Sequence, residues 1–236
     1  MKTILASFML VLFMQVGVFS QTLLDEYDGI GAHSESALLD YIVSYTQDNP
    51  ASKIVFVIYV GNGEERVGSV KPYIKTVQYY LSDLRGLDPK IIDFRVVKGK
   101  TLFLRRIWAI SKNDPDLEFT DFEFDFSNLK SQMLYARTCL NCDGYPADPD
   151  THRIDWELLS KILKDNDSYS LRIEITGNKA YGDDGKEISE KAWFAEVRSL
   201  LIKETGIDNK RIKLVKFKAK KGETATIAKF YIIPPK

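Results

Sequence analysis

Two stretches of the chain repeat the same order of sequence patterns, and this duplication constrains the fold more than any other feature. A β-rich run ends in glycine and asparagine at 52–62, and a second such run ends in the same way at 170–178. A charged loop and a helical pattern follow each run, over about 70–84 in the first copy and about 188–204 in the second. Because such extended agreement is hard to obtain by chance, we interpret the chain as two diverged copies of one module.

The two helical patterns also end alike. Arg85-Gly-Leu-Asp-Pro-Lys-Ile-Ile92 parallels Thr205-Gly-Ile-Asp-Asn-Lys-Arg-Ile212. The glycine of each motif suits the C-cap of a helix, where the backbone adopts a left-handed conformation. Two strand-like runs then follow in each copy, at 91–97 with 101–110 and at 211–217 with 224–233.

An amphipathic helix precedes the first strand of each copy, so that each module reads helix–strand–helix–strand–strand. The fold class is therefore α/β (α+β), with two tandem repeats that each contain a small mixed β-sheet with two helices packed on one face. The apolar faces of these leading helices are formed by Leu38, Leu39, Ile42 and Tyr45 in the first copy and by Trp156, Leu158, Leu159, Ile162 and Leu163 in the second.

We place the first repeat at 21–111, a connecting region at 112–152 and the second repeat at 153–236. Within the connecting region, residues 116–126 alternate apolar with mostly acidic side chains, which is the period of a half-buried strand. We expect this segment to be the leading strand of the second module, as Leu23–Tyr27 is expected to be in the first. The region then ends in a loop at 139–151 that contains prolines and aspartates.

The N-terminal 20 residues predict export. Lys2 gives a positive start, an apolar run extends from Ile4 to Phe19, and Ser20 precedes Gln21. A basic start, a run of this length and small residues at its end are typical of a secretory signal peptide cleaved after Ser20. A retained membrane anchor is the alternative, but the run lies at the short limit of a spanning helix. We expect a periplasmic, envelope or extracellular protein without a membrane span after cleavage.

The charge balance argues against a nucleic-acid partner. The chain contains 33 basic and 33 acidic residues. Removal of residues 1–20 takes away a single charged residue, Lys2, so the remaining chain stays nearly neutral. A basic run does occur where Lys213, Lys216, Lys218, Lys220 and Lys221 alternate with Leu214 and Phe217. We interpret it as one solvated face of an exposed strand, where lysines deter edge pairing, in preference to a polyanion site.

The only cysteines, Cys139 and Cys142, lie three positions apart in a short loop. In an exported chain such a pair is expected to form a local disulfide. A redox role is the first alternative, but Asp143, Asp148 and Asp150 follow the pair and would raise a nearby thiol pKa. A metal site assembled with His152 is the second alternative. The sequence predicts no cofactor.

The helix-end motifs resemble those of a known family. A strand that ends near glycine, a helix that closes as in Tyr80-Leu81 to Ile92 or Leu200-Leu201 to Ile212, and a following strand are similar to the OmpA-like, peptidoglycan-associated domain. The likeness covers roughly 40 to 60 residues of each module. It implies a diverged tandem pair of such domains, as in uncharacterised exported bacterial proteins.

The resemblance also points to binding positions. In the family, an aspartate after the glycine-ended strand and an arginine early in the next helix hold diaminopimelate of the cell wall. Alignment of the strand ends places Asn62 and Asn178 at the aspartate position, and counting back from the helix ends places Tyr73 and Trp193 near the arginine position. Both charges are therefore missing from both copies, and an aromatic side chain lacks the bidentate carboxylate contact of arginine.

No nucleophile in the sequence can be tied to His33 or His152, the only histidines. We therefore expect no enzyme, but an exported, non-catalytic binding or structural protein of the cell envelope or periplasm, with peptidoglycan or another envelope polymer or protein as its partner. A thiol/disulfide or metal-dependent protein centred on Cys139 and Cys142 is the alternative. The sequence does not indicate an oligomeric state.

Overall fold

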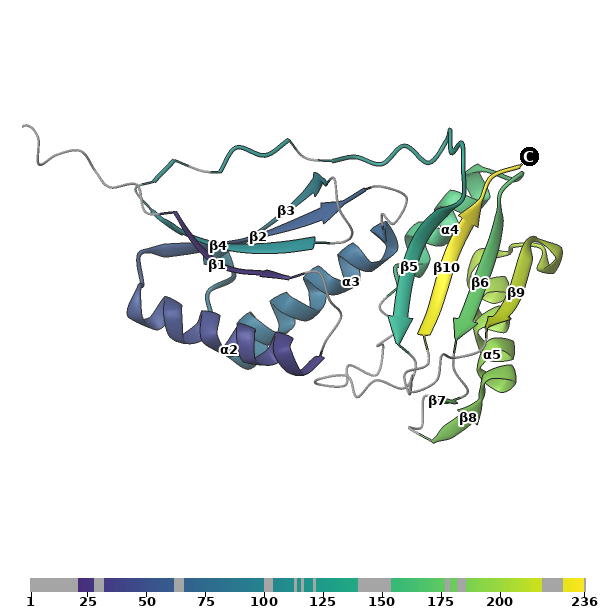
Figure 1. The fold of residues 1–236 in the computed structure, drawn as a ribbon, viewed down its shortest axis with the longest axis horizontal. Helices are drawn as coiled ribbons and strands as arrows, with labels where there is room; N and C mark the ends of the chain where they lie inside the picture. Colours follow the sequence, from purple (N-terminus) through teal and green to yellow (C-terminus); the bar gives the residue numbers. More distant parts are fainter. Residues whose placement is uncertain are drawn as a thin grey trace, which may run out of the picture.

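Two four-stranded sheets, each accompanied by two helices, make up the protein (Figure 1). This arrangement confirms the α/β fold class expected from the sequence. The computed structural model describes residues 21–27, 32–61, 66–99, 104–112, 114–115, 117–120, 122–139, 154–176, 179–181, 186–217 and 227–235. The predicted signal peptide lies outside these residues.

The first repeat forms a mixed sheet with the strand order β1-β4-β2-β3. β2 runs parallel to β3, and β4 runs antiparallel to both β1 and β2. A π-helical turn continues α3 without a break, and a 3₁₀ turn leads into β3. The elements are β1 (Thr22–Tyr27), α2 (Ala32–Asp48), β2 (Ser52–Val60), α3 (Val67–Gln78), the π-helical turn (Tyr79–Leu84), the 3₁₀ turn (Pro89–Ile91), β3 (Ile92–Lys98) and β4 (Leu104–Ser111).

The second repeat has the same topology, with the strand order β5-β10-β6-β9. Here β6 runs parallel to β9, and β10 runs antiparallel to β5 and β6. A short hairpin, β7–β8, precedes its second helix and has no counterpart among the described residues of the first repeat. The elements are β5 (Met133–Cys139), α4 (Trp156–Asp165), β6 (Ser170–Thr176), β7 (Lys179–Tyr181), β8 (Glu187–Ser189), α5 (Glu190–Thr205), a 3₁₀ turn (Asn209–Arg211), β9 (Ile212–Phe217) and β10 (Ile227–Ile233).

Local sequence explains where the elements start and stop. Gly86 and Gly206 adopt left-handed conformations, with φ of 73° and 65°, where their helices end. An aspartate stands two residues after each glycine. The side chain of Asp88 accepts a hydrogen bond from the backbone N–H of Lys90, and that of Asp208 accepts one from Lys210. Ser189 caps the start of α5 by accepting a hydrogen bond from the N–H of Ala192. The shared motif therefore ends the helix and forms the turn before the next strand in both repeats.

The leading strand of the second repeat differs from the expectation. Residues 116–126 were expected to form it, but their described part pairs into neither sheet, and β5 takes that place beside β10. Leu117 and Phe119 pack on the first repeat, whereas Phe124 and Phe126 pack on the core of the second. The alternation of apolar residues thus reflects contacts with two different cores.

The register of the strands also corrects the alignment of the two copies. Ile54 of β2 pairs with Ile92 of β3, and Leu171 of β6 pairs with Ile212 of β9. Since Ile92 and Ile212 hold the same place after the helix-end motif, Ile54 corresponds to Leu171. The copies are therefore offset by 117 positions at this strand rather than by the 116 that the aligned asparagines require. A one-residue slip exchanges the two faces of a strand, so this offset decides which residues of β2 and β6 hold equivalent positions.

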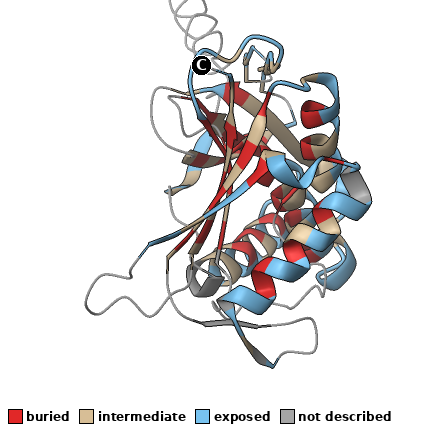
Figure 2. Ribbon diagram, turned by 90° about the vertical axis from the view of Figure 1, so that its right-hand side faces the viewer, coloured by how far each residue is buried: buried red, intermediate tan, exposed pale blue. Residues whose placement is uncertain are grey.

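The two sheets differ in how they are covered. Figure 2 shows that buried residues gather along the strands and on the inner sides of the helices. β2 is buried on both faces: Ile54, Phe56 and Ile58 pack beneath α2 and α3, while Val55 and Val57 contact Leu117 and Phe119 of the connecting segment. This segment crosses the face of the first sheet opposite its helices (Figure 1). β6 instead alternates between buried and half-buried residues, which is typical of a sheet covered by helices on one face.

A close contact joins the two repeats. Gly68, in the first turn of α3, lies so near Tyr135 of β5 that a Cβ atom at Gly68 would be 2.2 Å from the tyrosine ring. Three hydrogen bonds surround this contact: Arg66 N–H to the Leu134 carbonyl at 2.9 Å, Asp155 N–H to the Gly68 carbonyl at 2.7 Å, and the Tyr135 hydroxyl to the Asp155 carbonyl at 2.5 Å. The first turn of α3 is therefore part of both repeats.

We predict that Gly68→Ala destabilises the protein although alanine favours helices. The added methyl group clashes with the Tyr135 ring, and overpacking of this kind costs about 1–3 kcal/mol of unfolding free energy. Urea denaturation followed by circular dichroism measures the loss. In a Tyr135→Leu background, where the ring is absent, the same substitution should cost clearly less; an equal cost in both backgrounds would show that the contact does not restrict this position.

Candidate functional site

A buried polar cluster lies inside the first repeat, among otherwise apolar residues. It consists of Tyr27 at the end of β1, Glu35 in the first turn of α2, Tyr73 on α3 and Arg105 at the start of β4. Four separate elements therefore converge on it. Tyr27 and Arg105 are direct neighbours in the sheet, since they are paired in the β1–β4 ladder.

Contacts among the four side chains are mutual. The Arg105 side chain is only 3% exposed, and its Nη1 lies 3.5 Å from Oε1 of Glu35, whose side chain is 13% exposed. The Tyr27 hydroxyl is 2.8 Å from that of Tyr73 and 3.3 Å from Oε1 of Glu35. The Arg105 guanidinium also lies 4.0 Å from the ring centre of Tyr27 and 5.0 Å from that of Tyr73, within the range of cation–π attraction.

The electrostatics of the cluster keep the tyrosines neutral. Burial raises the pKa of Tyr27 far above its ordinary value, an effect that the positive charge of Arg105 reduces but does not cancel. Burial likewise raises the pKa of Tyr73. Both hydroxyls are therefore hydrogen-bond donors at neutral pH, and the pair of charges is that of Arg105 and Glu35.

The cluster lies at one end of the first sheet. Arg105 pairs with Ile58 near the carboxyl end of β2, and β3 runs parallel to β2, so both parallel strands end on this side. β1 also ends here at Tyr27, and α2 begins here at Ala32. In open α/β sheets, ligands bind beyond the carboxyl ends of parallel strands, so the cluster occupies the place where a site is expected.

Among its described residues, the second repeat has no counterpart of this cluster. Arg105 pairs with Ile58, and Ala228 pairs with Ile175, the counterpart of Ile58, so Ala228 holds the position of Arg105. Thr138 pairs with Ala228 as Tyr27 pairs with Arg105. Trp193 and Phe194, near the position of Tyr73, belong to the apolar core. The second repeat thus forms the same sheet with an uncharged residue at the position of Arg105.

The structure places the residues predicted from the sequence as follows. Tyr73 is 8% exposed and belongs to the polar cluster, whereas Trp193 is 3% exposed and packs in the second core. Cys139 is the last residue of β5. Asn62, Asn178, Cys142 and His152 lie outside the described residues, so the predicted site at the strand ends and the predicted disulfide stay predictions.

Three members of the cluster were missed: Tyr27, Glu35 and Arg105. The sequence contains one usable signal, the adjacent arginines Arg105 and Arg106 within a strand. Because neighbouring side chains of a strand point to opposite faces, one of the two must face the core. Arg106 points outward, with its side chain 37% exposed and paired with Glu26, so Arg105 is the one that is buried.

Other kinds of site have less support. Among the described residues, no group of three or more histidine, cysteine, aspartate or glutamate side chains is arranged to hold a metal ion. In the same part of the chain, no helix has the length and hydropathy needed to cross a bilayer. No family model and no curated protein matches this sequence, so the site is interpreted from its own geometry.

Stability at alkaline pH reports on the buried tyrosines. A tyrosine in the unfolded chain has a pKa of about 10, whereas burial raises the pKa of Tyr27 and Tyr73 in the folded protein. The stabilisation is therefore complete below pH 10 and is lost as the pH rises further, since the unfolded state releases its protons first. The free energy of unfolding should fall by up to about 1.4 kcal/mol per pH unit for each tyrosine.

Urea denaturation at several pH values from about 8 to 11 measures this slope. The Tyr27→Phe/Tyr73→Phe variant should have a smaller slope above pH 10, although Tyr135, whose pKa is also raised by burial, preserves part of it. Tyr41→Phe serves as the control because Tyr41 is 49% exposed. An unchanged slope in the double variant would contradict the assignment of neutral, buried hydroxyls.

Proposed function

We propose that the protein is an exported, non-catalytic binding protein of the bacterial cell envelope, in which the first repeat binds the ligand and the second repeat supports it. The observation that carries this proposal is the polar cluster around Arg105, buried at the carboxyl ends of the parallel strands. In the other copy, the positions of Arg105, Tyr27 and Tyr73 hold alanine, threonine and tryptophan.

The cost of the cluster favours a functional role. Removal of an ion pair from water is expensive, and well-packed apolar residues often stabilise a core as well or better. The second repeat shows such packing at the corresponding positions, with Ala228 fully buried. The second repeat forms the same fold with alanine at the position of Arg105. We therefore attribute the buried charge of the first repeat to ligand binding and not to stability.

The chemistry of the cluster favours binding over catalysis. The raised pKa values of Tyr27 and Tyr73 make their hydroxyls hydrogen-bond donors and disfavour the ionised form that a nucleophile or base requires. Arg105 holds both rings and Glu35 in place. The guanidinium of Arg105, which is held in position by Glu35 and the two rings, is the group of this cluster that is suited to a carboxylate.

Peptidoglycan is the partner that we propose. The sequence resemblance to peptidoglycan-associated domains points to it, and its stem peptides carry the carboxylates and amides that arginine and tyrosine side chains recognise. Asn62 follows β2 in the sequence, at the end of the strand where the cluster lies. We place the ligand beyond the carboxyl ends of β2 and β3, with Tyr73 and Arg105 beneath it.

Co-sedimentation of residues 21–236 with insoluble peptidoglycan tests the proposal. Wild-type protein should pellet, and Arg105→Met should weaken binding by about tenfold or more, since hydrogen bonds to charged groups are lost. Arg106→Met is a matched control, because Arg106 is the adjacent residue on the opposite face of β4 and pairs with Glu26 and Tyr59. An Asn62→Ala/Asn178→Ala variant tests the positions at the strand ends.

Tyr73→Phe separates binding from folding, since it keeps the ring and removes only the hydroxyl. Thermal unfolding should show that this variant is folded while its binding is reduced. The proposal fails if wild-type protein stays in the supernatant, or if Arg106→Met loses as much binding as Arg105→Met. Loss of binding only in the double asparagine variant would move the site away from the cluster.

A further inference from the structure

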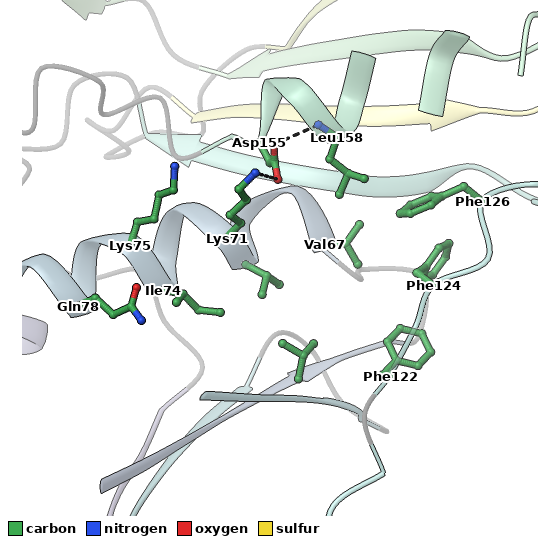
Figure 3. Close-up of a pocket in the computed structure, with 12 residues that line it drawn as sticks. Val67, Lys71, Ile74, Lys75, Gln78, Phe122, Phe124, Phe126, Asp155 and Leu158 are labelled. Atoms are coloured by element: carbon green, nitrogen blue, oxygen red, sulfur yellow. Dashed lines mark hydrogen bonds and ion pairs between the residues drawn. The ribbon is translucent and has the colours of Figure 1, made fainter. Parts of the chain in front are cut away.

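A hollow lies between the two repeats, and none of the four residues of the polar cluster lines it. It has a volume of about 490 Å³ and is bordered by α3 of the first repeat, by the connecting segment and by the start of α4 of the second repeat (Figure 3). This volume is within the range of sites for small organic ligands, which are frequent at the junction of structural units. Three parts of the chain that are distant in sequence therefore build one site.

The wall of the hollow is apolar. Phe122, Phe124 and Phe126 of the connecting segment face Ile74 and Val67 of α3 across it (Figure 3). The phenylalanine rings contact one another, with centres 5.8 Å apart between the first two and 4.6 Å apart between the last two. All three are only partly buried, so an apolar surface is left open to water, and such surfaces mark binding sites.

One rim of the hollow carries positive charge. Lys71 lies 3.0 Å from Glu157 and 3.8 Å from Asp155. Asp155 is already engaged, since its side chain caps α4 by accepting a hydrogen bond from the N–H of Leu158. Lys75, one helical turn from Lys71, lines the same rim and interacts electrostatically with Glu157. Asp155 and Glu157 balance these two lysines, and the lysines exceed the acids by one only when Lys161, Lys164 and Asp165 of α4 are included.

A neighbouring polar hollow extends from the same rim. It has a volume of about 510 Å³ and shares Lys71, Asp155 and Leu158 with the apolar one. Its remaining lining comes from α4 and includes Lys161 and Lys164. A ligand with an apolar body in the first hollow would thus place its polar end where water and lysine side chains are both available.

We infer that this hollow binds a single aliphatic chain that ends in a carboxylate, with the chain against the phenylalanines and the carboxylate at Lys75 and Lys71. The apolar lining accounts for the chain, and the charge of the rim selects the anion. Glu157, whose side chain is 85% exposed, turns into solvent as the ligand carboxylate takes its place beside Lys71. This site is separate from the proposed peptidoglycan site in the first repeat.

Isothermal titration calorimetry with dodecanoate, at concentrations below micelle formation, tests the inference on residues 21–236. Dodecanol and dodecyltrimethylammonium have the same chain with a neutral and a cationic end. Dodecanoate should bind with one site per chain, dodecanol roughly threefold to fivefold more weakly, as expected for the loss of an exposed ion pair, and the cation more weakly still. Equal affinity for all three, or binding of none, overturns the inference.

Two variants locate the site. Ile74→Trp fills the hollow and should abolish binding while the unfolding temperature stays near that of the wild type. Lys75→Glu should weaken dodecanoate binding by roughly fivefold or more, since repulsion replaces attraction, and should leave dodecanol unaffected. Lys90→Glu is the charge-matched control, because Lys90 is exposed in the 3₁₀ turn before β3. Unchanged dodecanoate binding by Ile74→Trp would place the ligand elsewhere and overturn the inference.

Discussion

The contact between Tyr135 and the backbone of α3 at Gly68 is the constraint on which the rest of the structure depends. It requires a residue without a side chain in the first turn of the helix, because any Cβ atom there would overlap the ring. Around it, hydrogen bonds of Arg66, Gly68 and Asp155 tie the start of α3 to β5 and to the start of α4. The connecting segment completes this junction by packing on the cores of both repeats. Because it passes from one core to the other, its phenylalanines line the hollow between the repeats.

The duplicated fold has diverged into two different units. In the first repeat both faces of the sheet are covered, and a charged cluster is buried where the parallel strands end. In the second repeat, the described helices cover one face and the other face displays polar side chains such as Arg172 and Glu174. The corresponding end of its sheet has Thr138 and Ala228, which are buried and uncharged. These differences are the basis of our proposal that the first repeat binds the ligand and the second supports it.

The sequence predicted the repeats, the helices and most strands because these depend on local signals, such as the periodicity of α4 and the glycines at 86 and 206. It failed at β5, where four consecutive residues from Met133 to Ala136 are buried and no alternation occurs. Residues 116–126 alternate apolar with polar side chains, but their apolar side chains pack on the cores of two different repeats. Local periodicity does not reveal this division. Arg105 was missed because its partners come from three other elements. The offset between β2 and β6 differs by one position from that of the asparagines, because strand register is fixed by pairing across the sheet.

Hydrogen–deuterium exchange with and without soluble peptidoglycan fragments tests most directly whether the first repeat alone binds the ligand. The account predicts slower exchange in β1, the first turns of α2 and the start of β4, which surround Arg105. It also predicts unchanged exchange in β5 and β10, which hold the corresponding positions of the second repeat. Protection of β5 and β10, or equal protection of both repeats, would contradict the division of function between the two copies.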